Sequence, residues 1–185
     1  ELMIYPNNYE HKIGFNDIKV LLSGFCQSEL GRERVEAMKF MTEAGDIRQS
    51  LQESQELETI FEETTDLPEM AFYDLRPSIH RIRLEGAHIE EEDLGKLKKS
   101  LDTLQSWLKI IRGKEESSEN YTYPALNQLS MGVFTFIAVA GAIDKTLDRY
   151  GKIKDDASPE LARIRHDLRA SEGSVNRTLH GILRI

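Results

Sequence analysis

The most regular pattern of hydrophobic residues in this chain lies between positions 94 and 111. Large apolar side chains recur there at alternating spacings of three and four residues: Leu94, Leu97, Leu101, Leu104, Leu108 and Ile111. This spacing places the apolar side chains along one side of an α-helix. We therefore predict a helix over this segment whose apolar seam packs lengthwise against another helix.

A second pattern begins at position 158 with three helix-start signals. Ser158 is an N-cap candidate, Pro159 occupies the first helical position, and Glu160 lies in the first turn. Apolar residues then recur every seven positions, with a shorter companion row: Leu161, Leu168, Val175 and Ile182, accompanied by Ile164 and Ile185. Such a heptad row predicts a helix that pairs with a second helix.

The companion row of this last helix is interrupted. Ser171 and Thr178 replace apolar residues in it, and Gly173 and Gly181 each weaken the helix by roughly 1 kcal/mol relative to alanine. Because such a helix is poorly stable alone, we predict that it needs a returning partner helix. The chain contains no such partner unless the seam at 94–111 supplies it.

Two short amphipathic helices are predicted near the beginning of the chain. Asn16 or Asp17 can cap the first, whose apolar positions fall within 18–25. Ser28 can cap the second, whose apolar positions fall within 35–40. Both patterns are typical of helices that lie on a surface.

A longer helix is predicted to follow, with Thr42 as its N-cap and Pro68 beyond its end, because the residue before a proline disfavours helical angles. Its apolar residues keep helical spacing between positions 47 and 60. Between positions 43 and 63 there are seven acidic residues and one basic residue, Arg48. This composition is typical of a helix face in contact with water rather than of a cation site.

The longest apolar stretch, residues 131–143, is too short to cross a bilayer, which needs about 20 residues. It leaves little room for a polar face, so we predict a central, buried helix. Pro124 can open a short helix before it. A polar loop is predicted at 114–120 and a turn at Tyr150-Gly151.

Composition restricts the possible partners. The 185 residues carry a formal net charge of -8, with a sequence pI near 5.2. A chain with this balance does not bind nucleic acid through its whole surface, because such binding needs lysines and arginines to replace counterions. A basic contact must be local, and the default is a single globular unit.

The last segment is the local exception, because its arginines outnumber its acids. Arg163, Arg165 and Arg169 could contact a phosphate backbone. The alternative is a solvated flank that pairs with acids on a partner helix. The excess of base is small, so we favour the second interpretation and keep the three arginines as candidate nucleic-acid contacts.

No catalytic constellation is found. None of the Gly-Lys pairs is followed by Ser or Thr, so there is no phosphate-binding loop, and the five histidines lack the spacing of a metal site. Cys26, the single cysteine, is interpreted as a buried residue rather than a nucleophile. The acids at 90–93 and 155–156 are interpreted as partners of helix dipoles and as solubilising charge. The chain is therefore expected to act mechanically or through interactions, without cofactor or metal of its own.

The ends of the chain suggest a longer parent protein. Met3 reads as a native start, with Glu1 and Leu2 as an added remnant, and the helical pattern still continues at Ile185. A lone cysteine, together with the lack of a leader pattern, predicts a cytoplasmic location.

One stretch resembles a known family. Residues 151–165, GKIKDDASPELARIR, are similar to the start of the lever helix in the bacterial MutS-like recombination suppressors, the MutS paralogues with a C-terminal Smr domain. Shorter matches occur in the same order: Cys26 with 28–31, then 74–76, 83–86 and 92–94. Together they span most of the chain.

The resemblance implies an all-α, multi-helical MutS-type core at 3–157 and a truncated lever helix from 158 to 185, after a remnant at 1–2. It implies a dimeric parent ATPase, with ATP and Mg²⁺ as cofactors, that acts on branched or mismatched DNA in recombination suppression and DNA repair. It also implies an Smr-linked endonuclease activity and a role on stalled ribosomes or ribosomal RNA. This fragment would supply structure and transmit motion, and it would not itself be an enzyme.

A second hypothesis is a free-standing helical adaptor that docks a partner helix on the seam at 94–111 or 161–182. An adaptor should end in a capped, stable helix, whereas a cut lever should fray from about Ser171 onward or use a neighbouring chain to cover its apolar row. A small enzyme is a more distant alternative, because it needs a polar pocket that these seams do not indicate.

Overall fold

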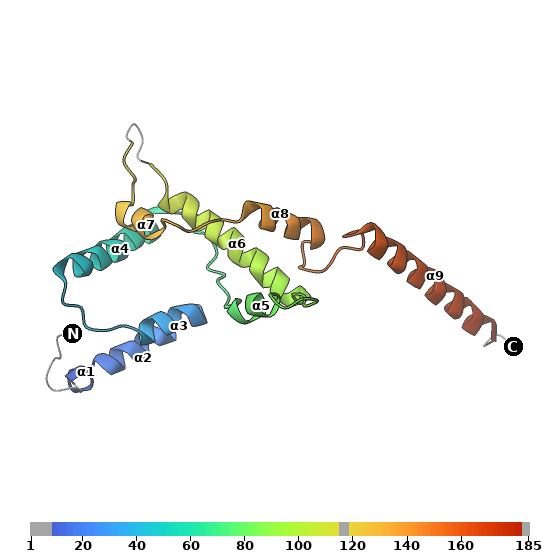
Figure 1. Ribbon diagram of the computed structural model, residues 1–185, viewed down its shortest axis with the longest axis horizontal. Helices are drawn as coiled ribbons and strands as arrows, with labels where there is room; N and C mark the ends of the chain where they lie inside the picture. Colours follow the sequence, from blue (N-terminus) through green and yellow to red (C-terminus); the bar gives the residue numbers. More distant parts are fainter. Residues whose placement is uncertain (1–8, 115–118, 183–185) are drawn as a thin grey trace.

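The computed structural model describes residues 9–114 and 119–182, and within these ranges it is all-α (Figure 1). No strand occurs among the described residues; the β-type pairings are the isolated bridges Lys114–Tyr121 and Leu147–Ile153. The all-α prediction is confirmed. Part of the predicted loop at 114–120 lies outside the described residues. No helix in the described ranges is long and apolar enough to span a membrane.

The helices follow one another in an elongated arrangement, with α6 near the centre and α9 projecting at one end (Figure 1). Their bounds are α1 Tyr9–Lys12, α2 Phe15–Phe25, α3 Glu29–Glu36, α4 Ala44–Glu63, α5 Arg76–Arg81, α6 Glu91–Ile111, α7 Pro124–Leu129, α8 Ile137–Thr146 and α9 Pro159–Ile182. The predicted helices at 94–111, from Pro124 and from Pro159 are therefore present.

The core consists of two apolar clusters that share α6. Leu101 of α6 packs with Ala140 and Ile143 of α8 in the first cluster. Trp107 of α6 packs with residues of α4 and α7 in the second. The seam at 94–111 thus faces the core, with Leu101 and Leu108 buried and its other apolar residues partly buried. It is divided between different partners and does not run lengthwise against one helix.

A buried carboxylate joins α4 to α7. Glu56 lies in α4, and its two carboxylate oxygens accept hydrogen bonds from the backbone amides of Ala125 (3.1 Å) and Leu126 (2.9 Å). These amides belong to the first turn of α7, where no partner exists within the helix. Glu56 therefore supplies hydrogen bonds that α7 cannot make itself.

Among the predicted N-caps, Ser28 is confirmed, because its side chain accepts a 3.1 Å hydrogen bond from the amide of Gly31. The other two predictions in this region were wrong by one to three residues. Gly14, with a positive φ of 77°, precedes α2 in place of Asn16 or Asp17. Glu43 precedes α4 in place of Thr42. A positive φ costs glycine little, so Gly14 turns the chain into the helix without a side-chain cap.

The prediction of a central, buried helix over 131–143 was wrong. Residues 131–136 are not helical, and α8 starts only at Ile137. Phe136 has a left-handed conformation with φ 46°, which a non-glycine residue rarely adopts and which interrupts a right-handed helix. The side chains of Phe134, Phe136 and Ile137 are exposed. Only the inner face of α8 reaches the core.

The N-terminal helices carry many exposed apolar side chains and lie on the surface, as predicted. Arg76 ties α3 to the rest of the chain, because its guanidinium pairs with Glu33 of α3 at 2.5 Å and with Asp74 at 2.7 Å. The hydrogen bond from Arg76 lowers the pKa of Asp74 to about 2. This link is therefore fully ionised at neutral pH.

Candidate functional site at the root of the last helix

The connector between α8 and α9, residues 147–158, begins with a tight turn. The carboxylate of Asp148 accepts hydrogen bonds from the backbone amides of Tyr150 (2.8 Å) and Lys152 (2.9 Å). Gly151 provides the positive φ of 77° that the turn requires. The hydrogen bond from the amide of Lys152 is the main cause that lowers the pKa of Asp148, and the bond from the amide of Tyr150 adds to it. The turn predicted at Tyr150-Gly151 is confirmed.

The second half of the connector folds back onto α8. The amide of Lys154 donates to the carbonyl of Thr146 at 2.9 Å, and its ammonium group donates to the carbonyl of Asp144 at 2.6 Å. Leu147 is buried in the first core cluster, and Ile153 packs against that cluster. The connector is consequently anchored to the core by both backbone and side chains.

Glu91, in the first turn of α6, holds the connector from the other side. One of its carboxylate oxygens accepts a 3.0 Å hydrogen bond from the amide of Ile153 and lies 3.6 Å from the ammonium group of Lys152. From its position in the sequence, Glu91 is expected only to complement a helix dipole and to add solubilising charge. In the fold it also links α6 to the segment that leads into α9.

The base of α9 is fixed to this connector by four contacts. The hydroxyl of Ser158 accepts a 3.1 Å hydrogen bond from the amide of Leu161, which confirms the predicted N-cap. The carboxylate of Asp155 pairs with the guanidinium groups of Arg165 and Arg169. Arg165 also donates to the carbonyl of Ile153 at 3.2 Å. We call the group of Asp155, Arg165 and Arg169 the Asp155 clasp.

The Asp155 clasp is ionic under ordinary conditions. Hydrogen bonds from Arg169 and Arg165 lower the pKa of Asp155, although partial removal from water acts in the opposite direction. Because the folded-state pKa lies below the usual 3.8, the stabilising contribution of the clasp is present above that pH and is lost as the pH falls below it. The clasp is therefore closed at neutral pH.

The three candidate arginines occupy different environments. Arg165 and Arg169 lie one turn apart on one face of α9 and share Asp155. Arg163 is exposed and has no hydrogen bond or ion pair with another described residue. Residues two positions apart do not face the same side of a helix. The structure thus brings two of the predicted residues together and leaves the third free.

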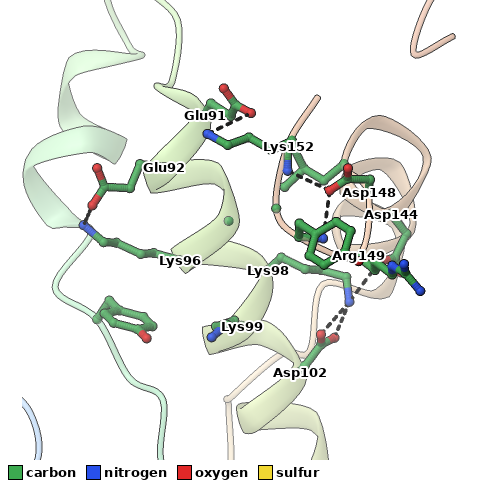
Figure 2. Close-up of a pocket in the computed structure, with 15 residues that line it drawn as sticks. Glu91, Glu92, Lys96, Lys98, Lys99, Asp102, Asp144, Asp148, Arg149 and Lys152 are labelled. Carbon is green, nitrogen blue, oxygen red and sulfur yellow. Dashed lines mark hydrogen bonds and ion pairs between the residues drawn. The ribbon is translucent and has the colours of Figure 1, made fainter. Parts of the chain in front are cut away.

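An open groove of about 620 Å³ lies between α6 and the connector, and charged side chains line it (Figure 2). Its cations are mostly paired within the groove: Lys96 contacts Glu92 at 2.7 Å, Lys98 contacts Asp102 at 2.5 Å and Asp144 at 3.0 Å, and Lys152 contacts Glu91. The charges largely neutralise one another, so the groove does not form a strong anion site. No group of three potential metal-binding side chains occurs among the described residues.

Beyond its base, α9 is a free helix with an exposed apolar row: Ile164, Leu168, Val175 and Leu179 are all exposed. No other helix of the described chain packs extensively against α9. The seam at 94–111 packs against α8, α4 and α7, so it is not the partner helix for the apolar row of α9.

Sequence reasoning did not identify Asp155 and Glu91 as structural links. Both were interpreted as acids that complement helix dipoles. The one local signal for the clasp is an acid three residues before an N-cap, followed by two arginines spaced four apart in the helix. The spacing shows that the arginines share a face, but not that the connector folds back toward them.

Comparison with known proteins gives a consistent result. Over 170 residues, 92% of the chain, 29% of positions are identical to a protein named Endonuclease MutS2 from Symbiobacterium thermophilum, and the match spans 21% of that relative. The chain is thus similar in sequence to a MutS2 protein. The same name belongs to relatives from Aquifex aeolicus, 23% identical over 93% of the chain, and from Streptococcus pyogenes, 27% identical over 96%.

The chain spans 21% to 22% of the length of these MutS2 relatives. The resemblance to MutS-like recombination suppressors is thereby confirmed over nearly the whole chain. A search of family models finds no match.

Proposed function

We propose that this chain is the helical core and lever base of a MutS2-like ATPase that acts on DNA. The observation that supports this proposal is the contrast within α9. Its base is tied to the connector by the Asp155 clasp and Ser158, whereas its remainder packs extensively against no other helix among the described residues. A helix held at one end and free along its length is suited to transmitting a rotation of the core.

The length of α9 makes such transmission effective. Its 24 residues extend about 36 Å at 1.5 Å per residue, so a rotation of roughly 10° at the base moves the far end by about 6 Å. We place ATP and Mg²⁺ binding, dimerisation and endonuclease activity in other parts of such a protein. Branched or mismatched DNA is the proposed substrate, and ribosomal RNA on stalled ribosomes is a second one.

The proposed motion can be measured in the full-length parent. Spin labels at Gln105 on α6 and Asn176 on α9, both exposed, report the distance between core and lever. Cys26 and any other cysteine are replaced first, so that only these positions react. We expect the distance distribution to change when ATP is added and to return after hydrolysis.

A label pair at Gln105 and Glu58 on α4 serves as the matched control, because both positions belong to the core and should keep one distance. An unchanged α6–α9 distance in all nucleotide states would contradict motion transmission. A change in both pairs would indicate a general rearrangement of the core.

Nucleic-acid contact is expected first at Arg163, because its guanidinium is free. Arg163→Ala should weaken binding of this chain to branched DNA about twofold to fivefold at low salt and reduce the salt slope by about one. Arg177→Ala, farther along α9, is the control with the same loss of charge. Fluorescence anisotropy with branched DNA, linear duplex and structured ribosomal RNA distinguishes the substrates. Equal effects of both substitutions would contradict a contact at the base of α9.

The exposed apolar row of α9 favours one other function, the helical adaptor. In that case α9 would bind a partner helix on this row, and the α6–α9 distance would not respond to nucleotide. The spin-label experiment therefore separates the two proposals.

A further inference from the structure

We propose that Asp155 is an internal competitor for phosphate, which masks Arg165 and Arg169 until a nucleic acid displaces it. This inference rests on the proposed nucleic-acid contact of α9 and adds a form of regulation to it. It concerns two arginines that the folded chain already places side by side.

The geometry of the clasp is that of an arginine pair around an anion. Arg165 and Arg169 lie four residues apart, and each donates to a different oxygen of the Asp155 carboxylate. A phosphate group offers the same negative oxygens to guanidinium donors. Asp155 therefore occupies the position in which a backbone phosphate would bind.

The clasp is accessible enough to exchange. The side chains of Asp155 and Arg169 are 50% and 67% exposed, and that of Arg165 is 34% exposed. Solvent-exposed ion pairs contribute little to stability and are weakened by salt. A polyanion that brings several phosphates to α9 can thus replace a single carboxylate.

Displacement of Asp155 would also change the lever base. Arg165 would keep its hydrogen bond to the carbonyl of Ile153, but the two ion pairs between the connector and α9 would be lost. Binding of nucleic acid and release of the base are then coupled, and the coupling is reciprocal. A motion of the core that opens the clasp would increase affinity for nucleic acid.

The test compares Asp155→Asn with Asp156→Asn in this chain. Asp156 is the neighbouring exposed acid and has no ion pair or hydrogen bond with another described residue, so both substitutions remove the same charge from nearly the same place. A short fluorescent DNA duplex is titrated and followed by anisotropy over a range of salt concentrations.

We expect Asp155→Asn to bind the duplex roughly threefold to tenfold more tightly at low salt, with a salt slope steeper by about one to two, because two more cations reach phosphates. Asp156→Asn should change affinity less than about twofold, because only the long-range charge effect remains. Adding Arg165→Ala and Arg169→Ala to Asp155→Asn should remove the gain.

A second measurement uses the chain without substitutions, so its result does not depend on whether the variants fold. The Nε–H signals of Arg165 and Arg169 in an NMR spectrum should shift when the DNA duplex is added, together with the carboxyl carbon of Asp155. Unchanged signals at saturating DNA would overturn the proposal.

The outcomes separate this inference from the proposed function. Masking is overturned if Asp155→Asn and Asp156→Asn raise the affinity for DNA equally. It is also overturned if neither raises the affinity while Arg163→Ala still weakens binding. In both cases the proposed nucleic-acid contact is retained. No binding by any variant overturns both masking and contact. The lever motion is still tested by the spin-label distances.

Discussion

Glu56→Ala should lower the free energy of unfolding of the helical core by about 2–4 kcal/mol, because it leaves buried amides without a partner. Glu56 is only 6% exposed, and its carboxylate accepts the amides of Ala125 and Leu126. A third hydrogen bond comes from the side chain of Gln52 at 3.2 Å. Alanine removes all three acceptor contacts and leaves a cavity between α4 and α7.

Urea denaturation followed by circular dichroism measures this effect. Glu58→Ala, an exposed acid on the same helix, is the control and should change stability by less than about 0.5 kcal/mol. Glu56→Gln keeps the shape of the side chain and one acceptor oxygen. Its loss in free energy of unfolding should therefore lie between those of Glu56→Ala and Glu58→Ala. If Glu56→Ala and Glu58→Ala gave equal stability, Glu56 would not be the link between α4 and α7.

The second large effect is expected at Ile60, one turn farther along α4. Its side chain is fully buried and packs against Trp107 of α6 and Leu126 of α7. Ile60→Ala should cost about 2–5 kcal/mol, because the removed methyl groups leave a cavity that the surrounding helices fill only partly. Ile60→Val, which removes one methyl group, should cost about 0.5–1.5 kcal/mol.

Leu51→Ala provides the comparison for Ile60, because Leu51 lies on α4 with 66% of its surface exposed. Its truncation should have a much smaller effect in the same denaturation assay. Similar losses at the two positions would show that α4 buries a different face in solution.

These two residues matter for the proposed function because a lever needs a rigid base. Glu56 and Ile60 join α4, α6 and α7, and α6 in turn holds α8 and the connector through Leu101 and Glu91. A destabilised α4–α7 joint should therefore loosen the platform on which α9 is mounted.

Local features of the chain were predictable from sequence. The alternating spacing at 94–111 specified a helix, and Ser158 with Pro159 specified where α9 begins. Helix periodicity and N-cap chemistry depend on residues a few positions apart, so they can be inferred without knowledge of the fold. The stretch at 151–165 indicated the MutS-like family by the same kind of local information.

Tertiary structure alone decided which surfaces are buried and which charges meet. The apolar residues near 131–143 predicted a central helix, but Phe136 turns the chain and most of them face outward. Asp155 reaches Arg165 and Arg169 only because the connector folds back between α8 and α6, through contacts with Thr146 and Glu91. Burial and ion pairing depend on residues that the fold brings together from distant parts of the chain, and a linear pattern does not contain those distances.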